Sequence, residues 1–329
     1  MDTTREAGIV VTGVARAFGT VQAVRNATLT VPPGSVTALI GPNGSGKTTL
    51  MLMLATLLTP DTGSIRIAGH DPVTDPQAVR AAMGWMPDAL GSWATLTVRA
   101  ALEVTGRMYR MDRVAAGVRA SELIELTGLS ALADQPSRVL SRGQKQRLSL
   151  ARSLVHDPDV LLLDEPASGL DPAARASLRE LVHRLAGEGK AILISSHVLA
   201  ELDEMADAAV YLSAGETASA DEIARAGASA RAWRIRTLDA VVLEYALTTI
   251  GVDRASISHD NLGTLVHVAD EPAAVVLLAQ LIAEGVPITA FGPAVGDLEH
   301  TFLDLNRAPG TVAPAPSSFP SPSSEETTP

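Results

Sequence analysis

The sequence contains no cysteine, which excludes a disulfide framework and a thiolate metal site. Apolar runs such as "LMLMLATLL", from Leu50 to Leu58, are far shorter than the roughly 18 residues that a membrane span requires. The N-terminus, "MDTTREAG", has no apolar run and predicts no signal peptide. We therefore expect a soluble chain that reaches a membrane only through a partner.

Positive charge is also scarce, since 26 lysines and arginines stand against 37 acidic residues and the formal net charge is −11. Proteins that bind nucleic acid usually carry a basic face, so no nucleic-acid partner is expected. Apolar residues make up 46% of the 329 residues, which is enough for a packed core. The length suggests about two domains.

Most of the first 215 residues alternate between apolar segments typical of strands and amphipathic segments typical of helices. This alternation predicts an α/β domain with a largely parallel sheet. Between residues 97 and 156 the pattern is helical throughout, which predicts a helical subdomain, about 90–156, inserted into the domain 1–215. The expected strands are Ile9–Val14, Leu29–Val31, Val36–Ile40, Val160–Leu163, Ala191–Ser195 and Ala209–Leu212, and the expected helices outside the insertion are Gly46–Leu57, Pro172–Ala186 and Val198–Met205.

Residues 216–307 predict a second, smaller α+β domain. Expected strands and helices follow one another as β-α-β-β-α-β, the order of a split-βαβ domain. The strands are Ala232–Arg236, Ser256–His259, Thr264–Val268 and Ile288–Phe291, and the helices are Leu238–Thr248 and Pro272–Ala283. Residues 308–329 are dominated by Pro and Ser and predict a disordered tail.

The segment "IGPNGSGKTTL" fits the pattern G-x-x-x-x-G-K-[ST] between an expected strand and an expected helix. Glycines allow such a loop to wrap around phosphate oxygens with its N–H groups pointing inward. Lys47 would reach the β- and γ-phosphates, and the Thr48 hydroxyl would bind Mg²⁺. The alternative is a Gly-rich turn with a chance Lys-Thr pair. The phosphate loop consists of Gly41, Pro42, Asn43, Gly44, Ser45, Gly46, Lys47, Thr48 and Thr49.

Acidic residues end the expected strand in "VLLLDEPASGLD". Asp164 is placed to hold Mg²⁺, and Glu165 is placed to act as the general base on an attacking water. His197 follows another expected strand and would contact the γ-phosphate at the same edge of the sheet. The alternatives are ordinary solvated acids and a structural histidine.

The segment "VLSRGQKQRLSL" is a polar loop that opens into an amphipathic helix. Free N–H groups at a helix N-terminus favour an anion. Ser141, Gly143 and Gln144 stand at this position together with Arg142, whose charge raises the local positive potential.

Taken in order, "GPNGSGKT", "LSRGQKQRLSLAR", "LLLDEPASGLD" and "SSH" resemble the nucleotide-binding subunit of ATP-binding cassette (ABC) transporters, over roughly Ile9 to Leu212. The resemblance implies a P-loop NTPase fold in which two subunits face head to tail. Each ATP would lie between the phosphate loop of one subunit and the signature loop, residues 140–144, of the other. Ser141, the Gly143 N–H and Gln144 would then contact the γ-phosphate, Asp171 would lie at the dimer seam, and Phe18 would stack on adenine.

Two positions depart from the family pattern. Arg142 replaces the first glycine of L-S-G-G-Q, so either its side chain leaves a competent loop or the loss of glycine weakens the site. Asp88 stands where the family commonly has glutamine, and it could contact Mg²⁺ or the attacking water. The resemblance also implies that residues 93–97 line the groove for a coupling helix of the permease.

We therefore predict an ATP-hydrolysing subunit that powers a separate integral-membrane permease by ATP-driven dimerisation, as a homodimer or a heterodimer. It would lie in the cytoplasm, on the inner face of the membrane. The "LSRG" variant and the closing helix Asp297–Leu305 resemble exporters of drugs, antibiotics or lipids. The alternatives are an importer ATPase, a soluble ABC ATPase acting on ribosomes or DNA, and a non-hydrolytic regulator.

Overall fold

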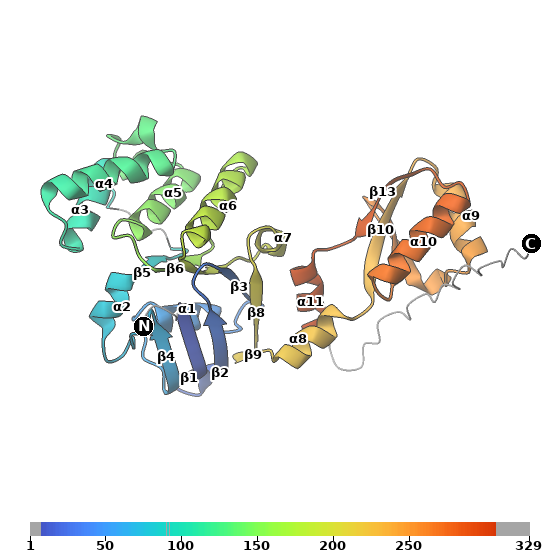
Figure 1. Cartoon of the computed structure of the whole chain (residues 1–329), viewed down its shortest axis with the longest axis horizontal. Helices are drawn as coiled ribbons and strands as arrows, with labels where there is room; N and C mark the ends of the chain where they lie inside the picture. Colours follow the sequence, from blue (N-terminus) through green and yellow to red (C-terminus); the bar gives the residue numbers. More distant parts are fainter. Residues whose placement is uncertain (1–7, 90, 92, 307–329) are drawn as a thin grey trace, which may run out of the picture. The chain divides into compact units, whose positions relative to one another are not determined.

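The computed structural model describes residues 8–89, 91 and 93–306. The chain divides into two compact units, Met1–Ala218 and Ser219–Pro329. Their secondary structure is drawn in Figure 1. Each unit is described by itself below.

Nine strands of the described chain form the sheet of the first unit, in the order β4-β1-β2-β9-β8-β3-β7-β6-β5. From β8 to β5 the neighbouring strands are parallel. β3, β6 and β7 are almost continuously apolar and buried, as expected of strands covered on both faces. The five strands are β3 (Val36–Ile40), β5 (Met83–Met86), β6 (Val160–Asp164), β7 (Ala191–Ser195) and β8 (Ala208–Ser213).

The other end of the sheet is antiparallel and larger than predicted. β1 (Ile9–Phe18) pairs with both β2 (Val21–Val31) and β4 (Thr62–Ile67). The sequence predicted only the ends of β1 and β2 and missed β4 and the two-residue β9 (Glu216–Thr217). In these strands polar residues on the exposed face interrupt the apolar pattern, so the buried residues alternate rather than form runs.

Every named element between β5 and β6 in the described chain is a helix. They are α3 (Val98–Met108), α4 (Arg113–Leu126), α5 (Arg142–Ser153) and two short 3₁₀ segments, Ser130–Leu132 and Ser137–Val139. The remaining helices of the unit are α1 (Lys47–Leu54), α2 (Pro76–Ala82), α6 (Pro172–Gly187) and α7 (Leu199–Asp203), of which α2 was not predicted. The predicted α/β fold with an inserted helical region is confirmed.

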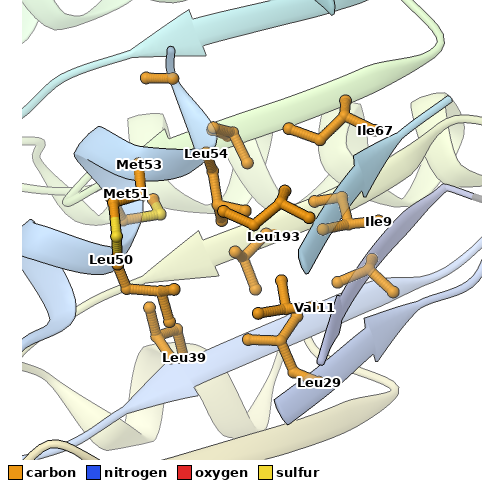
Figure 2. Packing of buried hydrophobic residues seen from close by; sticks show 14 of the residues in the cluster. Ile9, Val11, Leu29, Leu39, Leu50, Met51, Met53, Leu54, Ile67 and Leu193 are labelled. Carbon is orange, nitrogen blue, oxygen red and sulfur yellow. The ribbon is translucent and has the colours of Figure 1, made fainter. Parts of the chain in front are cut away.

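One hydrophobic core joins the two ends of the sheet to α1. Figure 2 shows Ile9, Val11, Leu29 and Ile67 of the antiparallel strands facing the α1 side chains and Leu39 and Leu193 of the parallel strands. The α1 residues in this core are Leu50, Met51, Met53 and Leu54, all at most 1% exposed. Burial of this face fixes α1, and α1 in turn fixes the loop that precedes it.

The second unit contains a four-stranded antiparallel sheet in the order β11-β12-β10-β13. Its elements are β10 (Arg231–Thr237), α9 (Ala240–Ile250), β11 (Ile257–Asp260), β12 (Gly263–Val268), α10 (Glu271–Ala283) and β13 (Ile288–Pro293), which is the predicted split-βαβ order. Leu243, Leu247, Leu277 and Leu281 of the two helices pack with Ile235 and Val266 of the sheet. α8 (Ala220–Gly227) and α11 (Asp297–Leu305) flank this fold and contact each other.

The predicted tail, 308–329, lies outside the described residues. Among the helices that the structure describes, none is both long enough and apolar enough to cross a membrane. The predicted closing helix at Asp297–Leu305 is present as α11.

Leu193 of β7 tests the central core because its side chain is fully buried in the core that joins the two ends of the sheet. Replacing it with alanine removes buried methyl groups and leaves a cavity, so Leu193→Ala should lower the free energy of unfolding by about 2–5 kcal/mol. Urea unfolding followed by tryptophan fluorescence measures this change. Val118→Ala, on the exposed side of α4, is the matched control and should change it by less than about 0.5 kcal/mol. Equal values for the two variants would contradict the assigned core.

Candidate functional site

The phosphate loop connects the end of β3 to the first turn of α1. Gly46 is the N-cap of α1 with φ 105° and ψ 1°, a left-handed conformation that glycine adopts without strain. A Cβ at Gly46 would lie 2.3 Å from the Ala23 carbonyl oxygen, and one at Gly41 would lie 2.2 Å from the Leu212 carbonyl oxygen. Pro42, Asn43 and Gly44, between them, are exposed. The loop therefore presents its backbone to solvent in the manner required to bind an anion.

Lys47 is the first residue of α1, and its ammonium group donates hydrogen bonds across the loop. The acceptors are the carbonyl oxygens of Gly41, at 2.6 Å, and Pro42, at 3.2 Å. Burial lowers the pKa of Lys47, while the negative charges of Glu165 and Asp164 oppose this effect. Lys47 thus lies near both acids, as the sequence predicts. Thr48 and Thr49 follow it in the first turn of α1, and Thr48 is exposed.

Asp164 and Glu165 stand at the carboxyl end of β6 and face different partners. Asp164 accepts a hydrogen bond from the Ser195 hydroxyl, at the end of the neighbouring β7. Glu165 has φ 52°, an uncommon left-handed backbone for a residue with a side chain. Its N–H donates to the Ser195 carbonyl oxygen at 3.0 Å. The turn at Glu165 directs the two neighbouring carboxylates to different places.

His197 and Asp88 complete this cluster. Glu165 Oε2 lies 2.7 Å from His197 Nδ1, and the side chains are 17% and 67% exposed, respectively. Burial is the largest cause that raises the pKa of Glu165, the hydrogen bond to His197 lowers it, and the charges of Asp164 and Asp88 raise it further. The net result is a carboxyl group whose pKa lies above its usual value, as is common where a group exchanges protons. The structure thus brings together Lys47, Asp88, Asp164, Glu165 and His197.

The signature loop, residues 140–144, leads into α5. Ser141 and Gln144 form a capping box at the start of α5, in which each side chain accepts a hydrogen bond from the backbone N–H of the other. A Cβ at Gly143 would lie 3.1 Å from the Gly169 carbonyl oxygen, which shows how closely these backbones approach. Within the described chain, the side chains of Ser141 and Gln144 bond to each other's backbone, and Gly143 approaches Gly169 and Leu170.

Arg142 is the first helical residue of α5, so its backbone does not require glycine. Its guanidinium donates a hydrogen bond to Ser168 Oγ at 2.8 Å. This geometry meets the condition of the first interpretation, in which the side chain leaves the loop. The competence of the site remains a prediction.

Phe18 and Asp171 have defined local contacts. Phe18 ends β1 with 46% of its surface exposed, and the Arg16 guanidinium carbon lies 5.1 Å from its ring centroid. Asp171 is the N-cap of α6 and accepts a hydrogen bond from the Ala174 N–H at 2.9 Å. Phe18 therefore offers an exposed ring face, whereas the contact shown for Asp171 caps a helix.

A groove of about 490 Å³ lies between the end of α1, β5, α3 and α5. Of the residues predicted to line a groove for the permease, 93–97, Trp93 lines this groove and residues 94–97 do not. Arg152 lies over the Trp93 ring at 4.8 Å and donates a hydrogen bond to the Gly91 carbonyl oxygen. Tyr109 and His156 stack in its wall with ring centroids 3.7 Å apart. No periodicity in the sequence indicated these side chains, because their meeting depends on the packing of α3 against α5.

Two polar residues at the acidic cluster were also missed. Ser195 hydrogen-bonds to Asp164, and buried Gln146 of α5 donates a hydrogen bond from Nε2 to the Glu165 carbonyl oxygen at 2.6 Å. Ser195 was within the quoted "SSH" motif. Gln146 lies on the buried side of α5, where a polar residue indicates a specific partner.

Comparison with known proteins decides the family. Residues 24–168 match the family model described as "ABC transporter". The chain is 30% identical over 318 residues to the daunorubicin/doxorubicin resistance ATP-binding protein DrrA of Streptomyces peucetius, covering 94% of this chain and 95% of that protein. The chain belongs to the ABC transporter family.

A second relative of this ABC protein is the daunorubicin resistance ATP-binding protein DrrA3 of Streptomyces coeruleorubidus. It is 38% identical over 221 residues, or 66% of this chain and 70% of that protein. The probable multidrug ABC transporter ATP-binding protein YbhF of Escherichia coli is 43% identical over 178 residues, or 54% of this chain and 31% of that protein.

Solved structures agree with the family assignment. An ATP-binding subunit of an ABC transporter superposes with a TM-score of 0.61 at 26% identity, covering 66% of this chain and 92% of that chain. A dimeric cassette bound to ADP and phosphate gives a TM-score of 0.59 at 24% identity, over 64% and 97% of the two chains, and shows the shared fold. The protein is an ATPase, the ATP-binding and ATP-hydrolysing subunit of an ABC transporter.

Gly46→Ala tests the conformation of the phosphate loop. A methyl group there meets the Ala23 carbonyl oxygen and forces a residue with a Cβ into left-handed backbone, so ATP binding should weaken about tenfold or more. Titration calorimetry with MgATP measures the affinity, and circular dichroism verifies the fold. Gly187→Ala is the control, since no atom lies within 4 Å of its Cβ position. Equal affinity of both variants would show that the loop tolerates a side chain at 46.

Proposed function

We propose that this ATPase hydrolyses ATP in a head-to-tail dimer, as either a homodimer or a heterodimer, with each ATP held between two subunits. The observation that carries the proposal is the 2.7 Å contact between Glu165 Oε2 and His197 Nδ1, close to Lys47 of the phosphate loop. By the family resemblance, the signature loop of a second subunit would complete this site. The same contact favours hydrolysis over the alternative of a non-hydrolytic regulator.

In this proposal Glu165 accepts a proton from the attacking water. His197 holds the Glu165 carboxylate and faces the γ-phosphate with its exposed ring. Lys47 and the N–H groups of the phosphate loop, residues 41–49, stabilise the charge on the β- and γ-phosphates. Phe18 stacks on adenine, and Ser141, the Gly143 N–H and Gln144 bind the γ-phosphate of the opposite subunit. Asp171 lies at the seam between the subunits.

The residues present fit Mg²⁺, which would neutralise charge on the phosphates. The Thr48 hydroxyl and Asp164 carboxylate are oxygen donors, and Asp88 lies near the same cluster. The described residues include no cluster of three or more His, Asp or Glu side chains able to hold a metal by themselves. Mg²⁺ commonly binds through one or two protein oxygens together with phosphates and water, which suits this sparse donor set.

In this proposal the transported substrate is bound by the partner, an integral-membrane permease. We assign its docking site to the groove lined by Trp93, because apolar and aromatic side chains form most of its wall. The subunit would then lie on the cytoplasmic face of the membrane.

Export of a drug-like compound is favoured because the relatives are named for daunorubicin resistance, multidrug transport and Nod factor export. These names favour export over import and over action on ribosomes or DNA.

Residues 1–215 would form the ATPase domain, with the helical subdomain at about 90–156, and residues 216–307 an accessory domain. Support comes from the contact boundary between Ala218 and Ser219 and from the separate core of the second unit. The alignment with DrrA runs through both units, so the accessory domain is part of the family resemblance to that protein.

The pH dependence of hydrolysis tests the proposed base. Glu165 must be deprotonated to act, so kcat should fall as the pH falls through its pKa. His197→Ala removes the hydrogen bond that lowers this pKa and should move the acid limb to higher pH. Asp88→Asn removes a charge that raises it and should move the limb to lower pH. The midpoint of each kcat profile is the measurement, and Glu165→Gln should lower kcat about 10²-fold or more.

The control for the profiles is Glu122→Gln, which changes an acid on α4 that pairs with Arg119. Its acid limb should coincide with that of the wild type. Limbs that move in the same direction in His197→Ala and Asp88→Asn would contradict the assigned charge network.

A pull-down tests the permease. Glu165→Gln protein, which binds but does not hydrolyse ATP in this proposal, should retain a hydrophobic integral-membrane protein from detergent-solubilised membranes, and more of it with MgATP than without. Trp93→Ala should retain less because it removes the ring from the groove. Recovery of ribosomes or DNA-bound proteins instead would support the soluble alternative.

A further inference from the structure

The first two turns of α5 are hydrogen-bonded at two points to the loop that follows β6, residues 165–171, here called the post-β6 loop. Gln146 donates a hydrogen bond to the Glu165 carbonyl oxygen, and Arg142 donates one to Ser168 Oγ. Both donors project from the helix that begins with the signature loop. Both acceptors belong to the loop that begins with the proposed base. α5 therefore begins at the residues that would bind the ATP of the opposite subunit. The same helix contacts the loop that would hydrolyse the ATP of its own subunit.

The hydrogen bond from Gln146 holds the backbone of Glu165, the proposed general base. Gln146 is 2% exposed, and its Nε2 lies 2.6 Å from the Glu165 carbonyl oxygen. Glu165 has a left-handed backbone, which persists only where neighbouring groups hold it. Its N–H is held by the Ser195 carbonyl oxygen of β7, so the two sides of this residue are held by two different elements. Displacement of α5 changes one of these attachments and leaves the other in place.

The contact at Arg142 fixes the middle of the same loop. Besides its hydrogen bond to Ser168, the Arg142 side chain packs on Gly169, where a Cβ would lie 2.8 Å from Arg142 Cδ. Gly169 has φ 74° and leaves the space that the arginine fills. Next to it, Gly143 approaches the Gly169 carbonyl oxygen. The signature loop and the post-β6 loop are thus in van der Waals and hydrogen-bond contact and move together over short displacements.

We propose that Gln146 and Arg142 are positioning residues that couple the two ATP sites of the dimer through α5. The proposal rests on the proposed function, in which the signature loop binds the ATP of the opposite subunit. Binding there fixes the N-terminal turn of α5. Gln146 then holds the Glu165 backbone, and Arg142 holds Ser168, in the arrangement that hydrolyses ATP at the subunit's own site. Occupancy of one site therefore sets the activity of the other.

The test is steady-state ATP hydrolysis by the full chain, with kcat, KM and the Hill coefficient measured separately. Gln146→Met keeps the length of the side chain but removes the donor. It should lower kcat about tenfold or more while KM changes less than about twofold, and it should reduce the Hill coefficient towards 1. Arg142→Met should also reduce the Hill coefficient, and Arg142→Lys, which retains a donor, should restore part of it.

Two further variants separate coupling from a loss of fold. Ser168→Ala should reproduce the effect of Arg142→Met, and the double variant should be no worse than either single one, because the two residues share one contact. Both positions are at least partly exposed, so this arm stands even if Gln146→Met does not fold. Arg147→Met is the control on the same helix, since its guanidinium lies towards Gly128, and it should keep kcat and the Hill coefficient within twofold.

The outcomes distinguish the two proposals. If the wild type hydrolyses ATP in a Glu165-dependent manner but shows a Hill coefficient of 1, the coupling is overturned and the proposed function stands. The same holds if Arg142→Met and Ser168→Ala match the wild type in every parameter. If Glu165→Gln hydrolyses ATP as fast as the wild type, the proposed function itself fails.

Discussion

The parallel register of the central strands is the constraint on which the site depends. Leu39 of β3 and Asp164 of β6 both stand opposite Ser195 of β7. The carboxyl ends of these strands therefore lie at one edge of the sheet, and the residues that follow them meet there. The phosphate loop, the two acids and His197 are separated by up to about 150 residues in sequence, yet each follows a strand that ends at this edge. A residue therefore reaches the site if it directly follows one of these buried strands.

The charge balance of the site follows from this convergence. Burial raises the pKa of Glu165 most, and the negative charges of Asp164 and Asp88 raise it further. Lys47 and the hydrogen bond from His197 offset part of that charge. A bound Mg²⁺ ion would offset part of this negative charge.

Much of this arrangement was predictable, and the exceptions have physical causes. β6 and β7 were predicted within one residue because buried parallel strands appear as continuous apolar runs. β4 and most of β2 were missed, since half of their side chains are exposed and polar. Lys47, Asp164 and Glu165 were identified from local motifs. The partners of Arg142 and Gln146 were not, because Ser168 and the Glu165 carbonyl oxygen reach them only through tertiary packing, which leaves no spacing in the sequence.

The packing of Arg142 on Gly169 has an evolutionary consequence. With arginine at 142, a Cβ at 169 would lie 2.8 Å from Arg142 Cδ, and a glycine at 142 removes this contact, although φ 74° still favours glycine at 169. The two positions should therefore vary together among descendants of this protein. A lineage that gains a side chain at 169 must first shorten the one at 142. Glycine at 169 places no such restriction on position 142, so the order of the two changes is fixed.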